Sequence, residues 1–316
     1  MSVVRQFAHW SSPLCILDTR RIDRMAIANA REMLLEAAEG NYAVGAFNIT
    51  NFIQMQAVIE AAVAKNAPLI IQTSVTPSRF LGAHVVVAVY RALAESAPIP
   101  IAVNLDHCRE VEYCKECADA GYTSLMMDAS HELIDENVKQ TKAVCDYAHA
   151  VGDISVEGEL GTVCGVEDQI EVAQDEAQLC DPDLAVEFVD RTGVDLLAPA
   201  IGTAHGIYKT KDPVVDVERL RRIDGLLNGR GARVPLVIHG GTGLPSATVR
   251  RLIAAGGAKF NVSTDLKHAL IDGMFGYMKE HRDEYNPGKV DIAAKEATRQ
   301  KVAYWIDLLG SAGKAG

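Results

Sequence analysis

The chain has 316 residues, 48% of them hydrophobic, and a formal net charge of −11 at pH 7. This negative charge excludes proteins that bind nucleic acid over a broad surface, because such binding needs clustered Lys and Arg. No apolar run is long enough to span a bilayer, and no hydrophobic signal segment opens the chain. We therefore expect a cytoplasmic protein with no nucleic-acid or membrane partner.

The cysteine pattern is typical of reduced thiols. The chain has seven cysteines, an odd number, spread along its length without a secretory signal. Cys114 and Cys117 form a CxxC, but they fall in Arg109–Ala120, which is predicted to be a helix rather than a strand-to-helix turn. We interpret both as small buried residues and not as a redox or metal-binding pair.

Short apolar runs rich in β-branched residues alternate with segments of helical period. In chain order, the predicted strands are Tyr42–Asn48, Leu69–Thr73, Ile101–Leu105, Ser124–Asp128, Ile154–Glu159, Val194–Ala200, Pro235–His239 and Lys259–Val262. The predicted helices include Phe52–Ala64, Arg79–Glu95, Arg109–Ala120, Glu132–Ala150, Pro182–Arg191, Asp216–Leu227, Ser246–Ala255 and, last, Asp291–Leu309. Eight strands, each followed by a helix, predict an α/β fold, the (β/α)8 TIM barrel, rather than an open doubly wound sheet.

The same pattern predicts one domain. No Pro/Gly/Ser-rich linker or low-complexity tract divides the chain. We predict a helical N-terminal extension over residues 1–27, and the barrel with a C-terminal helical tail over residues 28–316.

Reactive side chains fall where the predicted strands end, which is where this fold carries its chemistry. His107 ends the third strand, His205 follows the sixth and His239 ends the seventh. Three imidazoles with an open fourth position form a catalytic zinc site. Other polar residues at strand ends are Asn48, Ser74, Asp106, Asp128, Glu157, Glu159, Asn261, Ser263, Thr264 and Asp265.

Two glycine-rich runs, Gly202–Gly206 and Gly240–Gly243, follow the sixth and seventh strands. Glycine lets the backbone approach a ligand closely, and free backbone amides with Lys209 nearby suit a phosphate. Each run alone is a weak signal, because turns use glycine freely. Beside His205 and His239, however, they predict a phosphate next to a metal.

Six segments, in this order, resemble the class II fructose- and tagatose-bisphosphate aldolase family. They are Ala43–Asn48 (AVGAFN), Asn104–His107 (NLDH), Val156–Asp168 (VEGELGTVCGVED), Ala200–Lys209 (AIGTAHGIYK), Val237–Pro245 (VIHGGTGLP) and Asn261–Lys267 (NVSTDLK). The resemblance, which covers about Ala28 to Arg282, implies a lyase that reversibly cleaves a ketose (bis)phosphate through a zinc-stabilised enediolate. The expected products are dihydroxyacetone phosphate and an aldehyde such as glyceraldehyde 3-phosphate, with fructose 1,6-bisphosphate as the expected substrate.

The resemblance also implies a role for each candidate site residue. Asp106 would exchange the proton of the C4 hydroxyl, and Glu167 the carbon proton of the three-carbon fragment. Asn48 and Ser74 would line the substrate channel. The implied ligands of the catalytic Zn2+ are His107, His205 and His239, with Asp128 and Glu159 as alternatives when the ion shifts. The residues implied to cradle the C1 phosphate are Gly206, Lys209, Gly240, Thr242, Asn261, Ser263 and Thr264. Family members often bind a monovalent cation (Na+ or K+) near this phosphate and form homodimers or homotetramers.

Two departures from the family pattern leave the substrate open. Ser263 stands where many members have Asp and tagatose-type members have Ala. Asn286-Pro287-Gly288 replaces an Asp-Pro-Arg whose Arg reaches a neighbouring subunit's distal phosphate. The alternatives are therefore a tagatose-1,6-bisphosphate aldolase, or an aldolase for a ketose 1-phosphate that lacks the distal phosphate. A compensating Arg in the tail, such as Arg299, would restore the bisphosphate.

Other classes of protein fit less well. A metal-dependent hydrolase on this barrel commonly has His-x-His on its first strand, where this chain has AFN. A non-catalytic barrel subunit should lack the metal ligands that are present here. An imine-forming aldolase needs a lysine at a strand end, whereas Lys259 is predicted at the start of the eighth strand, at the opposite rim.

Overall fold

The computed structural model describes residues 26–167, 170–172, 178–206, 208, 210, 213–229 and 233–316. Most of the predicted extension over residues 1–27 lies outside this part of the chain, so the predicted domain division stays untested. No helix in the described ranges is long and apolar enough to cross a membrane.

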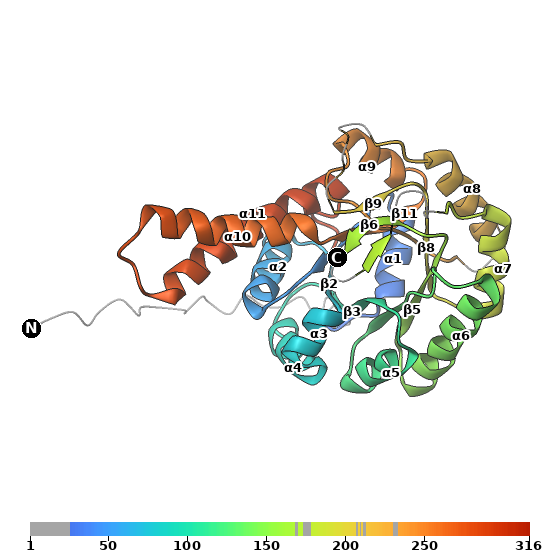
Figure 1. Ribbon diagram of the computed structural model, residues 1–316, viewed down its shortest axis with the longest axis horizontal. Coiled ribbons are helices and arrows are strands. Elements are labelled where there is room, and N and C mark those ends of the chain that lie inside the picture. The colour runs from blue at the N-terminus through green and yellow to red at the C-terminus, as the bar shows by residue number, and fades with distance from the viewer. Residues whose placement is uncertain are drawn as a thin grey trace, which may run out of the picture.

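Eight parallel strands close into a barrel in the order β1-β11-β10-β8-β5-β4-β3-β2 (Figure 1). The strands are β1 (Val44–Asn48), β2 (Leu69–Ser74), β3 (Ile101–Cys108), β4 (Ser124–Met127), β5 (Ser155–Leu160), β8 (Leu196–Pro199), β10 (Leu236–Ile238) and β11 (Gly257–Val262). They correspond to the eight predicted strands, with ends that differ by at most three residues. The predicted (β/α)8 barrel is confirmed.

Helices surround the barrel, as Figure 1 shows. They are α1 (Ala30–Glu39), α2 (Phe52–Lys65), α3 (Val75–Leu81), α4 (Ala83–Ala94), α5 (Val111–Ala120), α6 (Ile134–Val151), α7 (Pro182–Thr192), α8 (Val217–Asn228), α9 (Ser246–Ile253), α10 (Thr264–Glu280) and α11 (Pro287–Leu309). The single helix predicted at Arg79–Glu95 is wrong, because Gly82 adopts φ +86° and divides the segment into α3 and α4.

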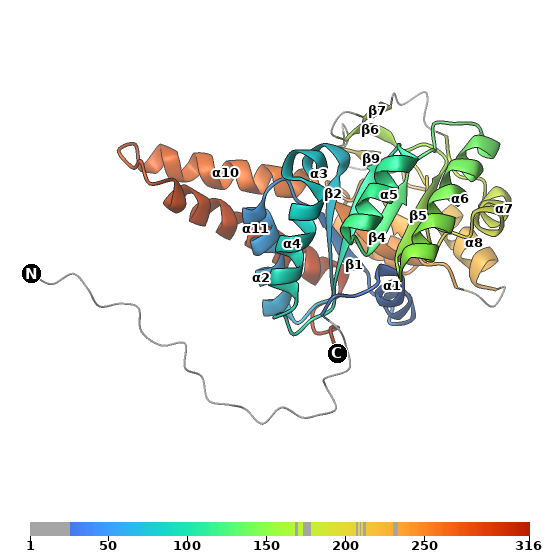
Figure 2. The same cartoon turned by 90° about the horizontal axis from the view of Figure 1, so that it is seen from below.

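A small second sheet was not predicted. Strands β6 (Cys164–Glu167), β7 (Ile170–Val172) and β9 (Ala204–His205) form it in the order β7-β6-β9. In the side view of Figure 2 it lies at the end of the barrel opposite α1. This sheet joins the loop after β5 to the loop after β8, because Gly165 pairs with His205. It therefore fixes part of the rim where the polar residues gather.

The hydrophobic core has two layers. One lies between the strands and the surrounding helices, and it includes Cys114 and Cys117, which are free and buried as predicted. The other fills the lower barrel interior and packs against α1, with Leu34, Val44 and Leu196 fully buried. Because this apolar layer fills one end, the inward-facing polar side chains are confined to the middle and to the carboxyl end of the strands.

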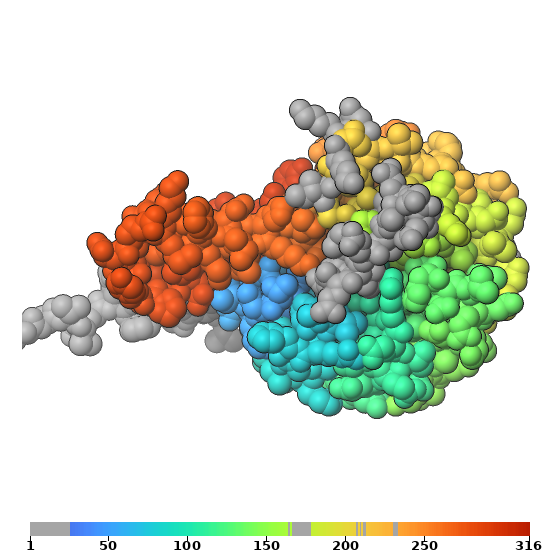
Figure 3. All heavy atoms as spheres, viewed as in Figure 1, coloured from blue at the N-terminus to red at the C-terminus, as the bar shows by residue number. Residues whose placement is uncertain are grey.

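The tail forms a helical arm. Helices α10 and α11 pack against each other, and α11 packs against α2. The distal half of this hairpin stands clear of the barrel (Figures 1 and 3). Helix α11 is four residues longer at its start than predicted, because Pro287 suits the first helical turn and the Asn286 side chain accepts a hydrogen bond from the Gly288 amide.

Candidate active site

The three candidate histidines meet above the barrel interior. His107 lies near the end of β3, His239 directly follows β10, and His205 ends β9. Since β3 and β10 are on opposite sides of the barrel, His107 and His239 approach each other across it. The ring centroid of His107 lies 4.8 Å from that of His205 and 4.6 Å from that of His239. All three side chains are buried.

A local irregularity lets Asp106 and His107 serve the same site. Adjacent residues of a regular strand face opposite sides. Here the pairing of β3 with β4 shifts register between Leu105 and Cys108, and His107 adopts φ +47°. This backbone conformation is uncommon for a residue with a side chain and is typical of functional sites. Both the carboxylate and the imidazole can therefore reach the site.

Hydrogen bonds orient two of the rings. The Nδ1 atom of His107 lies 3.0 Å from Asp128 Oδ2, and the Nε2 atom of His239 lies 2.9 Å from Glu157 Oε1. A neutral imidazole carries one N–H, and an ionised carboxylate can only accept. These contacts place an N–H on the outer nitrogen of each ring. The inner nitrogens, His107 Nε2 and His239 Nδ1, face each other over 2.9 Å.

Such an arrangement fits a bound cation. Glu159 adds a carboxylate oxygen, Oε2, that is buried and has no hydrogen-bond partner among the described residues. This oxygen lies 3.5 Å from His239 Nδ1. The ligand atoms of the three histidines lie within 4.8 Å of one another, and so do those of a second group, His107 with Asp128 and Glu159. Nitrogen and carboxylate ligands at such spacing suit zinc.

The ionisation of the site also favours a positive ion. Burial lowers the pKa of His107, but the nearby carboxylates outweigh it, Asp106 most strongly, and raise the pKa well above 6.5. Burial raises the pKa of Glu159 well above 4.5, and the charge of Asp128 adds to this. By contrast, burial and the neighbouring His107 lower the pKa of His205 well below 6.5. The carboxylates therefore favour a positive charge at the histidines, which a bound metal cation would supply in place of the proton on His107.

Asp106 is held in position by two amides. Its Oδ2 accepts a hydrogen bond from Asn48 Nδ2 at 2.8 Å, and its Oδ1 accepts one from Asn261 Nδ2 at 3.0 Å. Gln72, which the sequence did not single out, donates to Asn48 Oδ1 at 2.7 Å. Because amide N–H groups fill both oxygens, Asp106 is presented as an acceptor beside the histidines. Ser74, the last residue of β2, is also buried.

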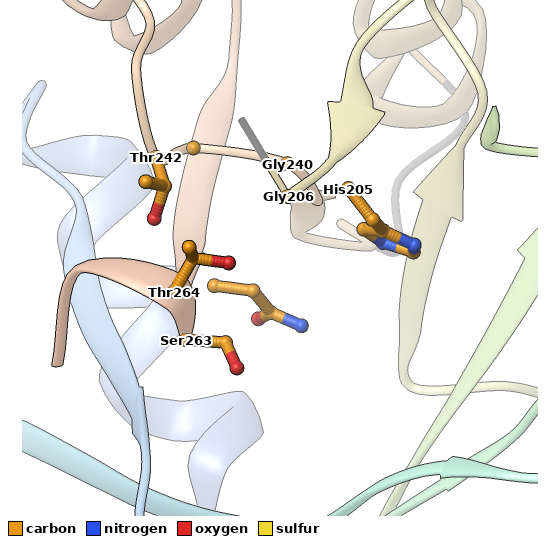
Figure 4. Close-up of a pocket in the computed structure, with 8 residues that line it drawn as sticks. His205, Gly206, Gly240, Thr242, Ser263 and Thr264 are labelled. Carbon is orange, nitrogen blue, oxygen red and sulfur yellow. The ribbon is translucent and has the colours of Figure 1, made fainter. Parts of the chain in front are cut away.

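A glycine-lined pocket adjoins the histidines (Figure 4). A Cβ atom on Gly240 would come within 2.3 Å of the Ala204 carbonyl oxygen, and the residue has φ +67°, so only glycine fits. Helix α10 begins at Thr264, and its N-terminal amides favour an anion. The pocket is lined by His205, Gly206, Gly240, Gly241, Thr242, Asn261, Ser263 and Thr264. The residues predicted to cradle a phosphate thus lie together, except Lys209, which falls outside the described residues.

Glu167 can be placed only through its backbone. It is the last residue of β6, two positions after Gly165, which pairs with His205. Its side chain lies outside the described part of the structure, so its predicted role in proton exchange stays a prediction.

Lys259 and Arg109 lie near the site in ways the sequence analysis did not predict. Lys259 is not at the opposite rim. It is in the middle of β11, fully buried, with its Nζ atom 2.6 Å from Glu157 Oε2. Arg109 follows the end of β3, and its Nε atom is 3.8 Å from Asp128 Oδ2. A charged residue inside an otherwise apolar strand was the available signal for the Lys259–Glu157 pair.

A TIM barrel with three histidines, an oriented carboxylate and an anion pocket at its carboxyl end defines a metal-dependent aldolase of the class II type. Comparison with known proteins agrees. The family model described as fructose-bisphosphate aldolase class-II matches residues 28–314. The chain belongs to the class II fructose-bisphosphate aldolase family, and it is an aldehyde-lyase. Members of this family generally depend on zinc, and the three-histidine group could hold a metal ion.

Curated relatives and solved structures support this membership. Fructose-bisphosphate aldolase of Staphylococcus aureus is 40% identical over 294 residues, covering 92% of this chain and 100% of the relative. That of Geobacillus stearothermophilus is 38% identical over 296 residues, covering 92% and 99%. The crystal structure of the YdjI aldolase from Escherichia coli K12 superposes with a TM-score of 0.79 at 32% identity, covering 92% and 100%. The crystal structure of a putative fructose-1,6-bisphosphate aldolase from Coccidioides immitis superposes with a TM-score of 0.82 at 30% identity. The match covers 91% of this chain and 98% of that one.

Proposed function

We propose that the chain reversibly cleaves fructose 1,6-bisphosphate to dihydroxyacetone phosphate and glyceraldehyde 3-phosphate. The observation that carries this proposal is the meeting of three histidines, two of them oriented by carboxylates, with Asp106 on one side and a glycine-lined pocket on the other. His107, His205 and His239 would hold zinc, with Asp128 and Glu159 as alternative ligands. Bound zinc supplies Lewis acidity that stabilises the negative charge developing as the C3–C4 bond breaks.

The protein's own groups would move the protons. In the cleavage direction, Asp106 takes the proton of the C4 hydroxyl, and the C4–O bond becomes the aldehyde carbonyl as the C3–C4 electron pair passes to the three-carbon fragment. Asn48 and Asn261 keep both oxygens of Asp106 in the accepting orientation. Glu167 then delivers a proton to C3, which completes dihydroxyacetone phosphate. Condensation follows the same steps in reverse.

The C1 phosphate would bind in the glycine-lined pocket. Backbone amides at Gly206 and Gly240, the hydroxyl groups of Thr242 and Thr264, and Lys209 supply donors for it. Ser263 Oγ and Asn261 Oδ1 are buried without hydrogen-bond partners among the described residues. The Ser263 hydroxyl can donate to the phosphate, whereas Asn261 Oδ1 can only accept and suits an accompanying Na+ or K+ ion.

The distal phosphate needs a partner other than Lys289 or Arg299, because both of these tail cations are already engaged. Lys289 pairs with Glu284 near the tip of the arm, and Arg299 donates two hydrogen bonds of 2.8 Å to Glu296. Arg109 is the better candidate. Its Nε atom is buried, makes no hydrogen bond within the described ranges and lies beside the metal site. A guanidinium there would let the same subunit pair with an anionic far end.

The second candidate substrate is a ketose 1-phosphate, which the absence of Arg at Gly288 favours. A panel of fructose 1,6-bisphosphate, tagatose 1,6-bisphosphate and fructose 1-phosphate distinguishes the two. Strict preference for a bisphosphate, with an Arg109→Met variant that raises its KM roughly 10-fold or more, supports the proposal. Equal turnover of the 1-phosphate and the bisphosphates supports the alternative. No dihydroxyacetone phosphate from any of the three would contradict both.

We further propose that the chain forms a homodimer, or a homotetramer built from such dimers, through the arm. Ile271, Phe275 and Met278 recur at helical spacing on α10 and are 59%, 63% and 47% exposed. Ile292 on α11 is 65% exposed. A row of exposed apolar side chains on a projecting hairpin is typical of a self-association surface. A cytoplasmic location remains part of the proposal and is supported by the five cysteines whose side chains the structure describes, which are all free.

A further inference from the structure

A buried ion pair crosses the barrel interior directly below the histidines. Lys259 on β11 and Glu157 on β5 are both fully buried, with Nζ and Oε2 2.6 Å apart. The two strands are separated by β8 and β10 in the barrel order. Glu157 Oε1 accepts a hydrogen bond from His239 Nε2 at 2.9 Å. One carboxylate therefore joins a lysine to a candidate metal ligand.

Stability alone does not account for this pair. Transferring two charges from water to a protein interior is costly, and apolar residues of similar size usually serve stability equally well or better. Apolar side chains already fill the lower barrel interior, among them Val44, Leu196 and Val237. Alternation along the strands places Glu157 one step below Glu159, and Lys259 one step below Asn261, on the inward face. The pair thus lies between the apolar layer and the site.

The other oriented histidine has a parallel arrangement. His107 is oriented by Asp128, whose second oxygen accepts a hydrogen bond from the Ser130 hydroxyl at 2.7 Å. In both cases a carboxylate contacts the outer nitrogen of a ring and is itself held by a second group. A carboxylate held in this way fixes the tautomer and the angle of a metal-binding imidazole and strengthens it as a ligand.

We infer that Lys259 and Glu157 are positioning residues, which hold His239 with its Nδ1 lone pair directed at the metal and thereby set the metal affinity of the site. This inference rests on the proposed three-histidine metal site. Lys259 acts from below the site without touching metal or substrate, and Glu157 acts through the imidazole. Lys259 is therefore not an imine-forming residue, because its amine is committed to Glu157.

Variants that separate positioning from folding test the inference. Glu157→Leu and Lys259→Met each leave the partner's charge buried alone, so both are expected to destabilise the apoprotein. The double variant removes both charges and is expected to regain stability. Lys295→Met is the matched control, because Lys295 forms an ion pair with Glu60 on the outer helices, where both side chains are partly exposed.

The zinc dissociation constant of each purified variant is measured by competition with a chelator, and apoprotein stability by denaturant unfolding. We expect the double variant to unfold at a denaturant concentration at least as high as that of either single variant. We nevertheless expect it to bind zinc about 10- to 100-fold more weakly than the wild type. Lys295→Met should bind zinc normally. Wild-type zinc affinity in the double variant would overturn the inference. Failure of the wild-type chain to bind zinc would instead overturn the proposed metal site.

Discussion

His107 Nε2 lies 2.9 Å from His239 Nδ1, although the outer nitrogen of each ring already contacts a carboxylate. With their outer N–H groups directed to Asp128 and Glu157, the two rings turn their inner nitrogens toward the same point. The nearby carboxylates raise the pKa of His107 well above 6.5, so without a metal a proton on His107 Nε2 is shared with His239 Nδ1. A bound cation would replace that proton and accept both nitrogen lone pairs. This relationship indicates that a cation belongs among these buried side chains, and it makes metal binding the condition on which the other properties of the site depend.

Asp106→Asn should remove the base without removing the metal. The amide occupies the same space but is not basic, so it cannot take up the hydroxyl proton as the carboxylate does. We expect kcat to fall by roughly 10²- to 10⁴-fold, the usual contribution of a positioned general base. Zinc content, measured by metal analysis, should stay at the wild-type level. A variant that keeps its zinc and full kcat would show that another group takes the C4 hydroxyl proton.

Gly240→Ala should damage the phosphate pocket. Its Cβ would lie 2.3 Å from the Ala204 carbonyl oxygen, and the backbone φ of +67° is strained for alanine by about 1–3 kcal/mol. To relieve this clash β9 must move, and that movement displaces His205, which is part of β9. We expect kcat/KM to fall by roughly 10²-fold, because a small displacement of a positioning group typically lowers the rate by that factor.

Gly276→Ala is the matched control for this variant. A Cβ on Gly276, in α10, meets nothing within 4 Å. Alanine in a helix interior stabilises by up to about 1 kcal/mol relative to glycine. Unchanged kinetics and slightly higher stability are expected for the control. Equal kinetics for Gly240→Ala and Gly276→Ala would contradict the close approach of the two loops.

Sequence reasoning could predict the barrel and the catalytic rim because both depend on local pattern. Apolar runs marked the strands, and side chains such as His107 and Asp106 at strand ends indicated one shared site. The second sheet could not be predicted, since β9 contains just Ala204 and His205 and has no period. The place of Lys259 was missed for another reason. A lysine near a strand start normally reaches solvent, and only a partner such as Glu157, distant in sequence, keeps it inside.

The Glu157 carboxylate should make stability depend on acid pH. Burial opposes its ionisation, but the charge of Lys259 and the hydrogen bond from His239 outweigh it and lower its pKa from 4.5 to about 2. A carboxylate with a lower pKa in the folded state stabilises that state above the unfolded pKa. This contribution, about 3 kcal/mol, should be complete above about pH 4.5 and should disappear as pH falls toward about 2.

The free energy of unfolding in urea is measured between pH 7 and pH 3 for the wild-type apoprotein and for Glu157→Gln. The variant is the reference because it has no carboxylate to protonate at this position. The difference in unfolding free energy between wild type and variant should shrink below about pH 4.5. Parallel curves down to pH 3 would mean that Glu157 has the same pKa in the folded and unfolded chain, which would contradict the prediction.

The exposed apolar face of α10 should hold two copies together. Phe275→Glu places a charge in the middle of that face, so we expect the oligomer to dissociate at micromolar protein concentration. Size-exclusion chromatography with light scattering measures the mass. Val214→Glu is the control, because Val214 is 91% exposed and lies outside the arm. A wild-type chain that is already monomeric, or a Phe275→Glu variant of unchanged mass, would contradict the proposed interface.

Metal removal followed by zinc replacement tests the central claim most directly. The purified enzyme is treated with a chelator, and cleavage of fructose 1,6-bisphosphate is followed by coupled detection of dihydroxyacetone phosphate before and after one equivalent of zinc is added. We expect cleavage to stop on chelation and to return with zinc, and we expect the enzyme to stay active when borohydride is added with substrate. Full activity in the metal-free protein, with inactivation by borohydride, would show an imine mechanism and contradict the zinc mechanism.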